Sequence, residues 1–235
     1  MLKMIAAMTA ALAVSGVAAA DLKNLGSLTQ DEFKLFAADS TSALSYKSVS
    51  PGDPLGLLGI DLGVEVSATR LSHPELLQSA TGVAREFLLS PRLHAHKGLP
   101  LDLDIGAFYA AVPAYDASLY GAELRWSPIA GNAVIPAVSL RGGFTMLSGP
   151  SNLDFRTTSA EVVISKGFLF IKPYVGAGLV YGSATPSVAG LSAVTLWQRK
   201  VFGGVNVNLG LVNMAVEADR TGHDSSYSAK LGFRF

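Results

Sequence analysis

The sequence predicts an all-β fold: a closed antiparallel transmembrane β-barrel of about ten strands, preceded by a short N-terminal helix. Three observations support this prediction. From residue 59 onward, apolar and polar residues alternate with period two in one segment after another. Each segment has about ten to thirteen residues, the length of a tilted strand that crosses a bilayer and longer than a typical globular strand. Longer and shorter connections also alternate along the chain, as in barrels whose long loops all lie at one end.

The first twenty residues, MLKMIAAMTAALAVSGVAAA, predict a cleaved signal peptide over residues 1–20. Lys3 supplies a short basic head, and the apolar run that follows it is shorter than the roughly 20 residues that span a membrane. The run closes on Ala18-Ala19-Ala20, which fits a small-residue cleavage site. We therefore expect an exported chain that begins at Asp21.

Residues 21–58 predict a helical segment and a linker that precede the barrel. Thr29 followed by Glu32 fits a capping box at the start of a helix. Apolar residues then recur at helical spacing, at Phe33, Phe36 and Leu44. Residues 51–54, Pro-Gly-Asp-Pro, break any regular element. Two interpretations stay open: a plug or mouth cover that enters from the side where the first strand begins, or a loose tail.

Residues 59–235 predict the barrel itself. In GIDLGVEVSAT, for example, Ile60, Leu62 and Val64 fall on one face, while Asp61 and Glu65 fall on the other. The ten predicted strands cover residues 59–70, 86–97, 101–112, 118–127, 134–146, 155–166, 169–181, 196–208, 211–220 and 226–235. An even number of strands returns the two ends of the barrel to the same side of the membrane.

Charged residues concentrate on the polar parity and predict an ionic network in the lumen. Each of them would cost a few kcal/mol if it faced lipid near the midplane. The network comprises Asp61, Glu65, Arg92, His94, His96, Asp102, Asp104, Glu123, Arg125, Arg141, Glu161, Lys172, Lys200, Glu217, Asp219, Lys230 and Arg234. Opposite charges on adjacent strands favour pairing. The expected pairs are His96 with Asp102, His94 with Asp104, Lys200 with Asp219, Asp61 with Arg234, and Glu65 with Lys230.

Aromatic residues on the apolar parity lie near the strand ends. Those expected toward the longer loops are Tyr109, Tyr120, Tyr181, Trp197 and Tyr227, and those toward the short turns are Trp126 and Phe235. Two aromatic bands on either side of an aliphatic band are typical of strands that meet two membrane interfaces. A soluble β-sandwich, the main structural alternative, has no reason for such bands.

The last nine residues, YSAKLGFRF, alternate Tyr227, Ala229, Leu231, Phe233 and Phe235 with polar or small residues. This segment resembles the C-terminal strand of Gram-negative outer-membrane β-barrel proteins, which ends in phenylalanine. The resemblance implies a location in the bacterial outer membrane. It also implies an assembly signal at Tyr227, Leu231, Phe233 and Phe235 for the barrel-assembly machinery, with outer-membrane lipid as the other partner.

The composition argues against several functions. Eighteen basic residues balance eighteen acidic ones, which argues against a nucleic-acid binder, and the absence of cysteine excludes thiolate metal sites. His94 and His96, beside carboxylates, are compatible with a metal site or a catalytic pair, but mutual satisfaction within the lumen is the simpler interpretation. On the predicted external side, His223-Asp224 faintly resembles the Asp/His pairs of the ten-stranded omptin proteases. We expect no metal, no cofactor and no enzyme, and the sequence indicates no ligand.

The sequence therefore favours an occluded outer-membrane barrel with a structural or surface-interaction role. The alternative is a narrow channel or transporter for small polar solutes, gated by the N-terminal segment. Ten strands enclose little more space than the eight whose interior side chains nearly fill a barrel. Glycines on the inward parity leave local room, at Gly176, Gly178, Gly204 and Gly232.

Overall fold

The computed structural model describes residues 22, 24–82, 84–115 and 117–235 of the chain. The predicted signal peptide, residues 1–20, lies outside the described residues. The helical elements are η1 (Leu25–Ser27), α2 (Gln30–Leu44), α3 (Pro74–Thr81) and η2 (Pro113–Tyr115). The strands are β1 (Ile60–Arg70), β2 (Phe87–Leu99), β3 (Leu103–Val112), β4 (Ala117–Ile129), β5 (Ala137–Ser148), β6 (Leu153–Ser165), β7 (Ile171–Pro186), β8 (Val194–Leu209), β9 (Val212–Thr221) and β10 (Asp224–Arg234).

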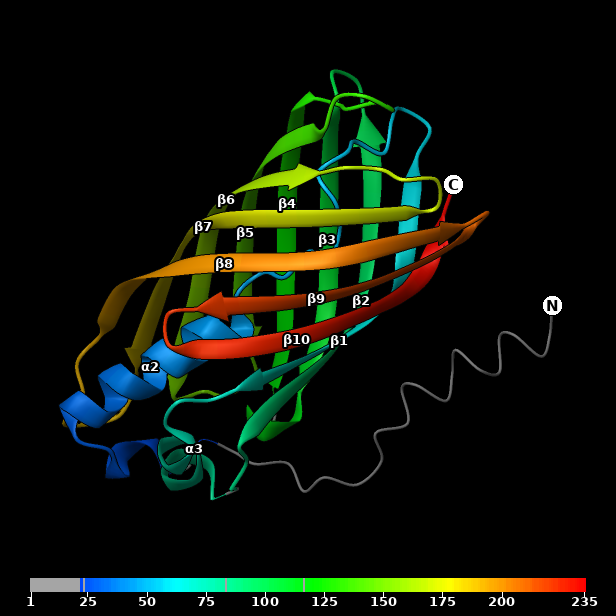
Figure 1. Ribbon diagram of the computed structural model, residues 1–235. Helices are drawn as coiled ribbons and strands as arrows, with labels where there is room; N and C mark the ends of the chain where they lie inside the picture. Colours follow the sequence, from blue (N-terminus) through cyan, green and yellow to red (C-terminus); the bar gives the residue numbers. More distant parts are fainter. Residues whose placement is uncertain (1–21, 23, 83, 116) are drawn as a thin grey trace, which may run out of the picture.

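The strands form one closed antiparallel barrel in which each strand pairs with its neighbours in sequence and β10 pairs with β1 (Figure 1). Closure leaves no sheet edge, so every backbone N–H and C=O group within the wall finds a partner without water. The prediction of a ten-stranded antiparallel barrel with an N-terminal helix is confirmed. The predicted segments correspond one to one to the strands, although β7 and β8 extend further than expected.

The two ends of the barrel differ. We call the end that carries α3, η2 and the connection 187–193 the loop end. The other end, which carries the β2–β3 and β8–β9 turns and the start of β1, is the turn end. The expected strict alternation of connection lengths is wrong. Residues 130–136 at the turn end form a longer connection than residues 149–152 at the loop end, because β5 and β6 continue almost to their hairpin turn.

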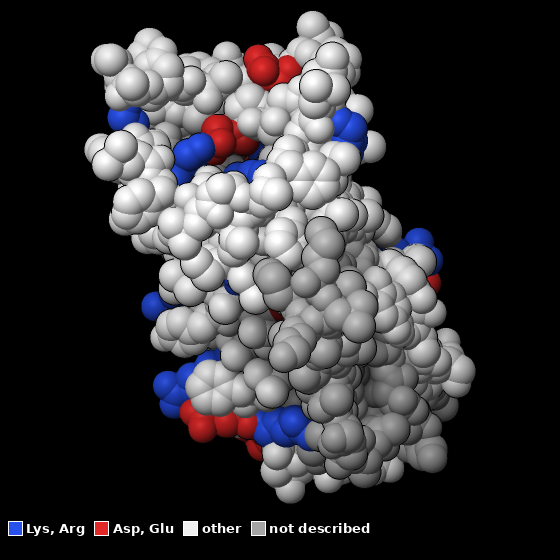
Figure 2. Space-filling model, turned by 90° about the vertical axis from the view of Figure 1, so that its right-hand side faces the viewer, with Lys and Arg blue, Asp and Glu red and all other residues white. Residues whose placement is uncertain are grey.

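The outward face of the barrel is apolar. Exposed aliphatic side chains such as Leu93, Leu124 and Val216 alternate with buried polar ones along the strands. In Figure 2 the part of the visible face that is not grey is mostly white, with only a few groups of charged atoms. Among the described residues, no helix is long and apolar enough to cross a bilayer. The exposed aliphatic side chains make the outward face the kind of surface that hydrocarbon accepts.

Exposed or half-buried aromatic side chains occupy both ends of the outward face. The pairs Tyr109–Tyr120 and Tyr181–Trp197 lie toward the loop end, with ring centroids 5.4 and 5.0 Å apart. Toward the turn end, Trp126 and Phe235 are exposed, and on β10 Tyr227 is exposed toward the loop end. The strand between Tyr227 and Phe235 spans about 26 Å, or about 20 Å along the membrane normal at a typical tilt. These positions match the two aromatic bands expected from the sequence.

Helix α2 begins at the predicted capping box. The Thr29 side chain accepts from the Glu32 backbone N–H, and the Glu32 carboxylate accepts from the Thr29 N–H at 2.8 Å. Phe33 and Phe36 are buried on the side that faces the barrel, while Leu35 is largely exposed. Burial of each phenylalanine contributes about 1.5–3 kcal/mol. The helix is thus fixed by its apolar side against the barrel and its loops.

The position of α2 differs from the prediction. The helix lies at the loop end, where it packs against α3 and β7 and where Gln30 bonds with Ser192 of the connection 187–193. The chain then runs through the interior from Ser45 to the turn end, where β1 begins (Figure 1, blue to cyan). Entry from the side where β1 begins is therefore wrong for this helix. Residues 45–58 are almost all buried or half-buried, and fourteen extended residues reach about 45 Å, enough for this passage.

The apolar core gathers at the loop end. It joins α2 and the residues before it to α3, η2 and the loop-end parts of the strands, and its members include Leu25, Phe33, Leu77, Tyr115 and Phe155. A much smaller cluster of Val163, Tyr174 and Phe202 lies in the wall of β6 to β8. Between the core and the turn end, the interior is polar, and the charged network lies there.

Candidate functional site: the filled interior of the barrel

Most charged residues predicted for the lumen are buried inside the closed barrel. The buried members are Asp61, Glu65, Arg92, His94, His96, Asp104, Glu123, Arg125, Arg141, Glu161, Lys200, Glu217, Asp219 and Lys230. Arg234 and Lys172 are partly buried. The prediction for Asp102 is wrong. Leu101 and Asp102 both have positive φ, 64° and 55°, in the three-residue turn 100–102, and this turn exposes Asp102 at the turn end.

Two of the expected histidine pairings are wrong. His96 lies opposite Gly106 and His94 opposite Phe108, because the β2–β3 turn is centred on Leu101 and not on Leu99. The register is shifted by an even number of residues, so each side chain keeps its face although its partner changes.

Of the other three expected pairings, one is wrong and two are found in the structure. Lys200 lies opposite Thr221, so its expected pairing with Asp219 is wrong as well. Asp61 lies opposite Arg234, as expected once β10 closes on β1. Glu65 lies opposite Lys230 in the same way.

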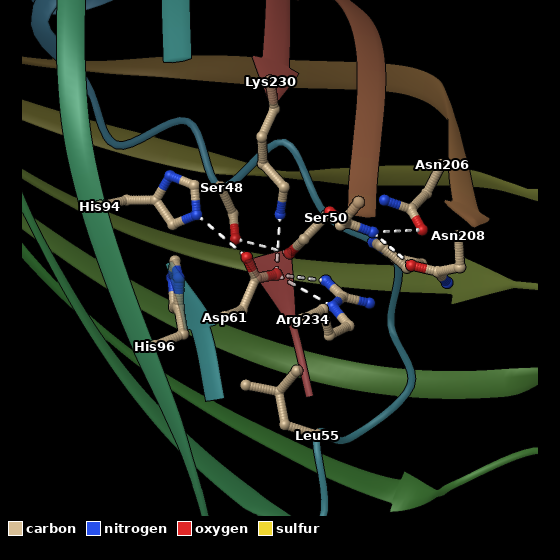
Figure 3. A network of polar contacts seen from close by, with 12 residues as sticks. Ser48, Ser50, Leu55, Asp61, His94, His96, Asn206, Asn208, Lys230 and Arg234 are labelled. Carbon is tan, nitrogen blue, oxygen red and sulfur yellow. Dashed lines mark hydrogen bonds and ion pairs between the residues drawn. The ribbon is translucent and has the colours of Figure 1, made fainter. Parts of the chain in front are cut away.

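Asp61 is the centre of the network at the closing seam of the barrel (Figure 3). One of its oxygens, Oδ2, accepts from Lys230 Nζ at 2.9 Å and from Arg234 Nη2 at 2.6 Å. The other, Oδ1, lies 3.1 Å from Nε2 of His94. The three partners come from β10 and β2, the two strands that flank β1. Asp61 therefore ties the first strand to both of its neighbours by charge-assisted contacts.

The two histidines are held within the same network. Nδ1 of His94 lies 3.2 Å from the Glu65 carboxylate, so this ring stands between two acids. Nε2 of His96 lies 3.2 Å from the Tyr46 hydroxyl and 3.8 Å from the Glu123 carboxylate. Within the described part of the chain, no group of three or more His, Asp or Glu side chains is arranged to hold a metal ion. Both rings thus lie beside buried carboxylates of the wall and form part of the same ionic network.

Arginines of the barrel wall form hydrogen bonds with the backbone of the N-terminal segment. Arg125 Nη1 donates to the Pro51 carbonyl at 3.0 Å and to the Ser50 hydroxyl at 3.1 Å. Arg141 donates to the carbonyls of Ser50 and Pro51. The remaining donors of Arg125 bind Asp104 at 2.8 and 2.9 Å, which keeps the guanidinium in place. An extended chain in the lumen cannot pair its carbonyls with itself, so these arginines replace the missing partners.

Two lysines form a second set of contacts between the segment and the wall, closer to α2. Lys200 Nζ donates to the Tyr46 carbonyl at 2.9 Å and to the Glu161 carboxylate at 2.7 Å. Lys47, which belongs to the segment itself, reaches the Asp219 carboxylate of β9 at 3.1 Å. Both ammonium groups are buried and each has an acid beside it, as buried charges require.

At the turn end, acids and bases continue the same pattern. Lys172 Nζ lies 2.6 Å from the Asp53 carboxylate, a partner that comes from the N-terminal segment and not from a neighbouring strand. The Leu55 backbone N–H donates to Asp104 at 3.0 Å. The segment is therefore bound to the wall at successive levels from the end of α2 to the start of β1.

Inward-facing glycines make the space for this segment. A Cβ at Gly182 would lie 2.0 Å from Oγ1 of Thr41, and a Cβ at Gly143 would lie 2.8 Å from Cβ of Tyr46. The glycines expected to leave room have other neighbours. Gly176 and Gly204 are covered by the wall's own rings of Phe202 and Tyr174. Gly178 and Gly232 are covered by the adjacent strands.

At the loop end, α2 is fixed by a carboxylate. Asp39 accepts from the His73 backbone N–H at 2.8 Å and lies 3.1 Å from Nδ1 of His73. Burial, together with the nearby Asp224 carboxylate, raises the pKa of Asp39 to about 6 against the lowering effect of His73. Ser40, the next residue of α2, bonds with the Tyr115 hydroxyl at 2.8 Å, and burial raises the pKa of that phenol.

His223 and Asp224, which faintly resemble an omptin pair in the sequence, do not form an ion pair with each other in the described part of the chain. Asp224 is buried and accepts from the Ser72 N–H and hydroxyl at 2.8 and 2.6 Å, whereas His223 is exposed. Asp224 is thereby committed to holding the first loop against β10. A His–Asp contact does exist at the loop end, between His73 and Asp39, but it joins a loop to the N-terminal helix.

Sequence reasoning missed the partners that the N-terminal segment supplies: Asp39, Tyr46, Lys47, Ser50 and Asp53. One signal was available. Residues 38–50, ADSTSALSYKSVS, are small and polar with only one charge of each sign, a composition that suits a chain packed in a polar lumen better than a helix in water.

Comparisons with known proteins find similar folds only. No family model and no curated protein matches the sequence. Among solved structures, the N-terminal β-barrel domain of Pseudomonas aeruginosa OprF is 13% identical, with a TM-score of 0.40 over 77% of this chain and 99% of that one. The KdgM porin in complex with disordered oligogalacturonate is 8% identical, with a TM-score of 0.39 over 76% and 99%. Neisserial surface protein A is 14% identical, with a TM-score of 0.36 over 75% and 94%. Likenesses this distant concern the barrel architecture alone and carry no information on function.

Proposed function

We propose that this chain is an integral outer-membrane barrel whose interior is closed by its own N-terminal segment, with a structural or surface-interaction role. The observation that carries the proposal is the occupied interior. Residues 45–50 are all buried, and the wall binds them through Arg125, Arg141 and Lys200. A solute would have to displace both the chain and its ionic contacts in order to pass.

The proposed location in a bacterial outer membrane draws on the outward face and the final strand. Exposed aliphatic residues lie between two sets of exposed aromatic residues. β10 closes the barrel against β1, and the Phe235 amide and carbonyl both pair with Ile60 at 3.0 and 2.6 Å. Export through the predicted signal peptide and assembly through Tyr227, Leu231, Phe233 and Phe235 belong to the same proposal.

Three of these residues lie in β10, which closes the barrel against β1, and Phe235 follows it directly. Tyr227, Leu231 and Phe235 are exposed and thus accessible to assembly machinery and to lipid. Substitution Phe235→Ser tests the assembly proposal. We expect less protein in the outer membrane while the purified chain still refolds in detergent, and an unchanged amount in the membrane would contradict the assigned role.

One observation favours a second function. The segment inside the barrel is held largely by hydrogen bonds and ion pairs, which water can replace, and not by a dry apolar interface. A narrow channel for small polar solutes that opens when the N-terminal segment moves is therefore the alternative function.

Planar-bilayer conductance of the refolded mature protein separates the two functions. A closed barrel gives no steady openings in the intact protein, and removal of residues 22–54 produces openings provided that the shortened chain still shows a heat-modifiable gel shift. Steady openings of the intact protein would overturn the proposed function in favour of the channel.

A further inference from the structure

An apolar groove crosses the outward face of the barrel over β7, β8, β9, β10 and β1. Its volume is about 740 Å³. Valines line its length, at Val66, Val175, Val205 and Val216. A smaller groove of about 360 Å³ adjoins it on the loop-end side, and Gly203, Ala218 and Tyr227 line both. The two form one continuous depression that runs from the loop-end interface toward the middle of the outward face.

Small residues at one level of the wall create this depression. The register places Ala68, Tyr227, Ala218 and Gly203 side by side on β1, β10, β9 and β8. The outward surface is recessed at these two alanines and the glycine, because the neighbouring residues have larger side chains. The exposed ring of Tyr227 lies at the same level. Contact with lipid alone does not require a groove, because acyl chains also pack on a convex surface.

Two arginines stand at the loop-end head of the depression. Arg220 lines the smaller groove, two residues beyond Ala218 on the same face of β9. Arg199 lies on the outward face of β8, and its carbonyl accepts from the Gly222 N–H at 2.9 Å, which places it diagonally beside Arg220. Cα atoms of residues in such a diagonal pair lie about 7–8 Å apart. At this distance two long side chains can both contact one small anion.

These two arginines differ from the other exposed arginines of the strands. Arg70 pairs with Glu86 at 2.8 Å, and Arg156 pairs with Asp154 at 2.7 Å. Arg199 and Arg220, in contrast, have no acidic side chain within 4.0 Å among the described residues. The other two exposed arginines of the strands are thus paired with acids, whereas the pair beside the groove is free to bind an anion from outside the chain.

We propose that the depression is a binding site for one anionic membrane lipid, with its phosphate on Arg199 and Arg220 and an acyl chain in the groove. The paired cations suit a phosphate, which guanidinium groups bind by two parallel hydrogen bonds. The groove is apolar and starts at the aromatic level, where lipid headgroups give way to hydrocarbon. The site rests on the proposed membrane insertion, but it does not depend on the closed interior.

Native mass spectrometry of the full mature protein in detergent micelles tests the site. Phosphatidylglycerol is the anionic probe, and phosphatidylcholine with the same acyl chains is the zwitterionic control. We expect one phosphatidylglycerol to stay bound and phosphatidylcholine to bind at least about tenfold more weakly, because it lacks the net charge that the arginines select. Equal retention of the two lipids would overturn the proposal.

Three variants separate the parts of the site. Arg199→Gln with Arg220→Gln removes the headgroup contacts, and Ala218→Phe fills the groove. We expect each of these changes to lower phosphatidylglycerol retention about tenfold or more. Arg156→Gln removes an equally exposed arginine away from the groove and should leave retention unchanged. A heat-modifiable gel shift of every variant shows that the barrel has folded, so a failure of insertion is distinguishable from a failure of lipid binding.

Three further results would contradict the site. Displacement of the lipid by an equal concentration of inorganic phosphate would show an anion site without a role for the groove. Full retention of phosphatidylglycerol by Ala218→Phe would likewise show that the groove plays no role in binding. A stable dimer that disappears in Ala218→Phe would assign the depression to a second copy of the chain.

Discussion

Removal of the Arg125 guanidinium should destabilise the folded barrel by about 3–5 kcal/mol, because it leaves a buried acid without its cation. The pair is almost completely buried, with side-chain exposures of 2% for Arg125 and 0% for Asp104. After Arg125→Met, Asp104 keeps only the Leu55 N–H, and the carbonyl of Pro51 loses a donor. The double variant with Asp104→Asn should cost less than the two single changes added together, because it removes both buried charges.

Urea titration of the protein in detergent micelles measures this loss, with tryptophan fluorescence as the probe. Trp126 lies beside Arg125 in sequence and reports on the same strand. The matched control is Arg156→Met, which breaks the exposed pair with Asp154 and should cost less than about 1 kcal/mol. If Arg125→Met costs no more than this control, or if its effect adds to that of Asp104→Asn, Arg125 is not part of a coupled network inside the barrel.

Three further predictions concern the helix, the lumen and the lipid face. The pKa of Asp39, raised to about 6, lies above its value of about 3.8 in the unfolded chain, so ionisation opposes folding and stability falls as pH rises from about 4 to above 6. Thermal unfolding from pH 4 to 8 should show this fall, and Asp39→Asn should flatten it; an unchanged slope would remove Asp39 as the cause. Gly143→Val should displace the segment at Tyr46 and lower the urea midpoint, whereas Gly142→Val on the outward side should have little effect, and equal losses would place the segment elsewhere. Leu93→Arg, midway along β2 on the outward face, should cost about 2–4 kcal/mol when the protein folds into lipid vesicles, and a cost near zero would mean that this face meets water.

The barrel could be predicted from the sequence because lipid imposes a strict rule on each residue of a spanning strand. A charge at Asp61 or Glu217 must turn inward, and its neighbours at Leu62 and Val216 must turn outward, so the alternation is visible without any knowledge of the partners. The capping box at Thr29 is equally local, since both of its groups lie within one helical turn. Rules of this kind act within a few residues and can be recognised in the sequence.

The pairing partners could not be predicted in the same way. The position of the β2–β3 hairpin depends on positive φ at Leu101 and Asp102, which neither residue type favours strongly. Alternation constrains faces but leaves registers that differ by two or four residues equally acceptable. The sequence therefore indicates that His96 points inward but not that its partner is Tyr46.

The course of the N-terminal segment was the least accessible feature. Its contacts join residues far apart in the chain, such as Lys47 with Asp219 and Asp53 with Lys172. A serine-rich stretch in a lumen and a serine-rich tail in water have the same composition. Only the match between this segment and the inward-facing glycines distinguishes them, and that match is a property of the folded barrel.

The presence of the segment inside the barrel is tested most directly by a disulfide between α2 and β7. An ideal Cβ at Gly182 lies 3.0 Å from Cβ of Thr41, so a shift of about 0.5–1 Å between α2 and β7 reaches the separation of about 3.8 Å in a disulfide. The chain has no cysteine of its own, so Thr41→Cys with Gly182→Cys can form only this bond within one chain. Oxidation of the folded protein in membranes should cross-link this pair nearly completely, as measured by mass spectrometry of its peptides, and should leave Thr41→Cys with the outward-facing Gly142→Cys unlinked. Absence of the first cross-link, or equal yields for the two pairs, would contradict a barrel filled by its own N-terminal segment.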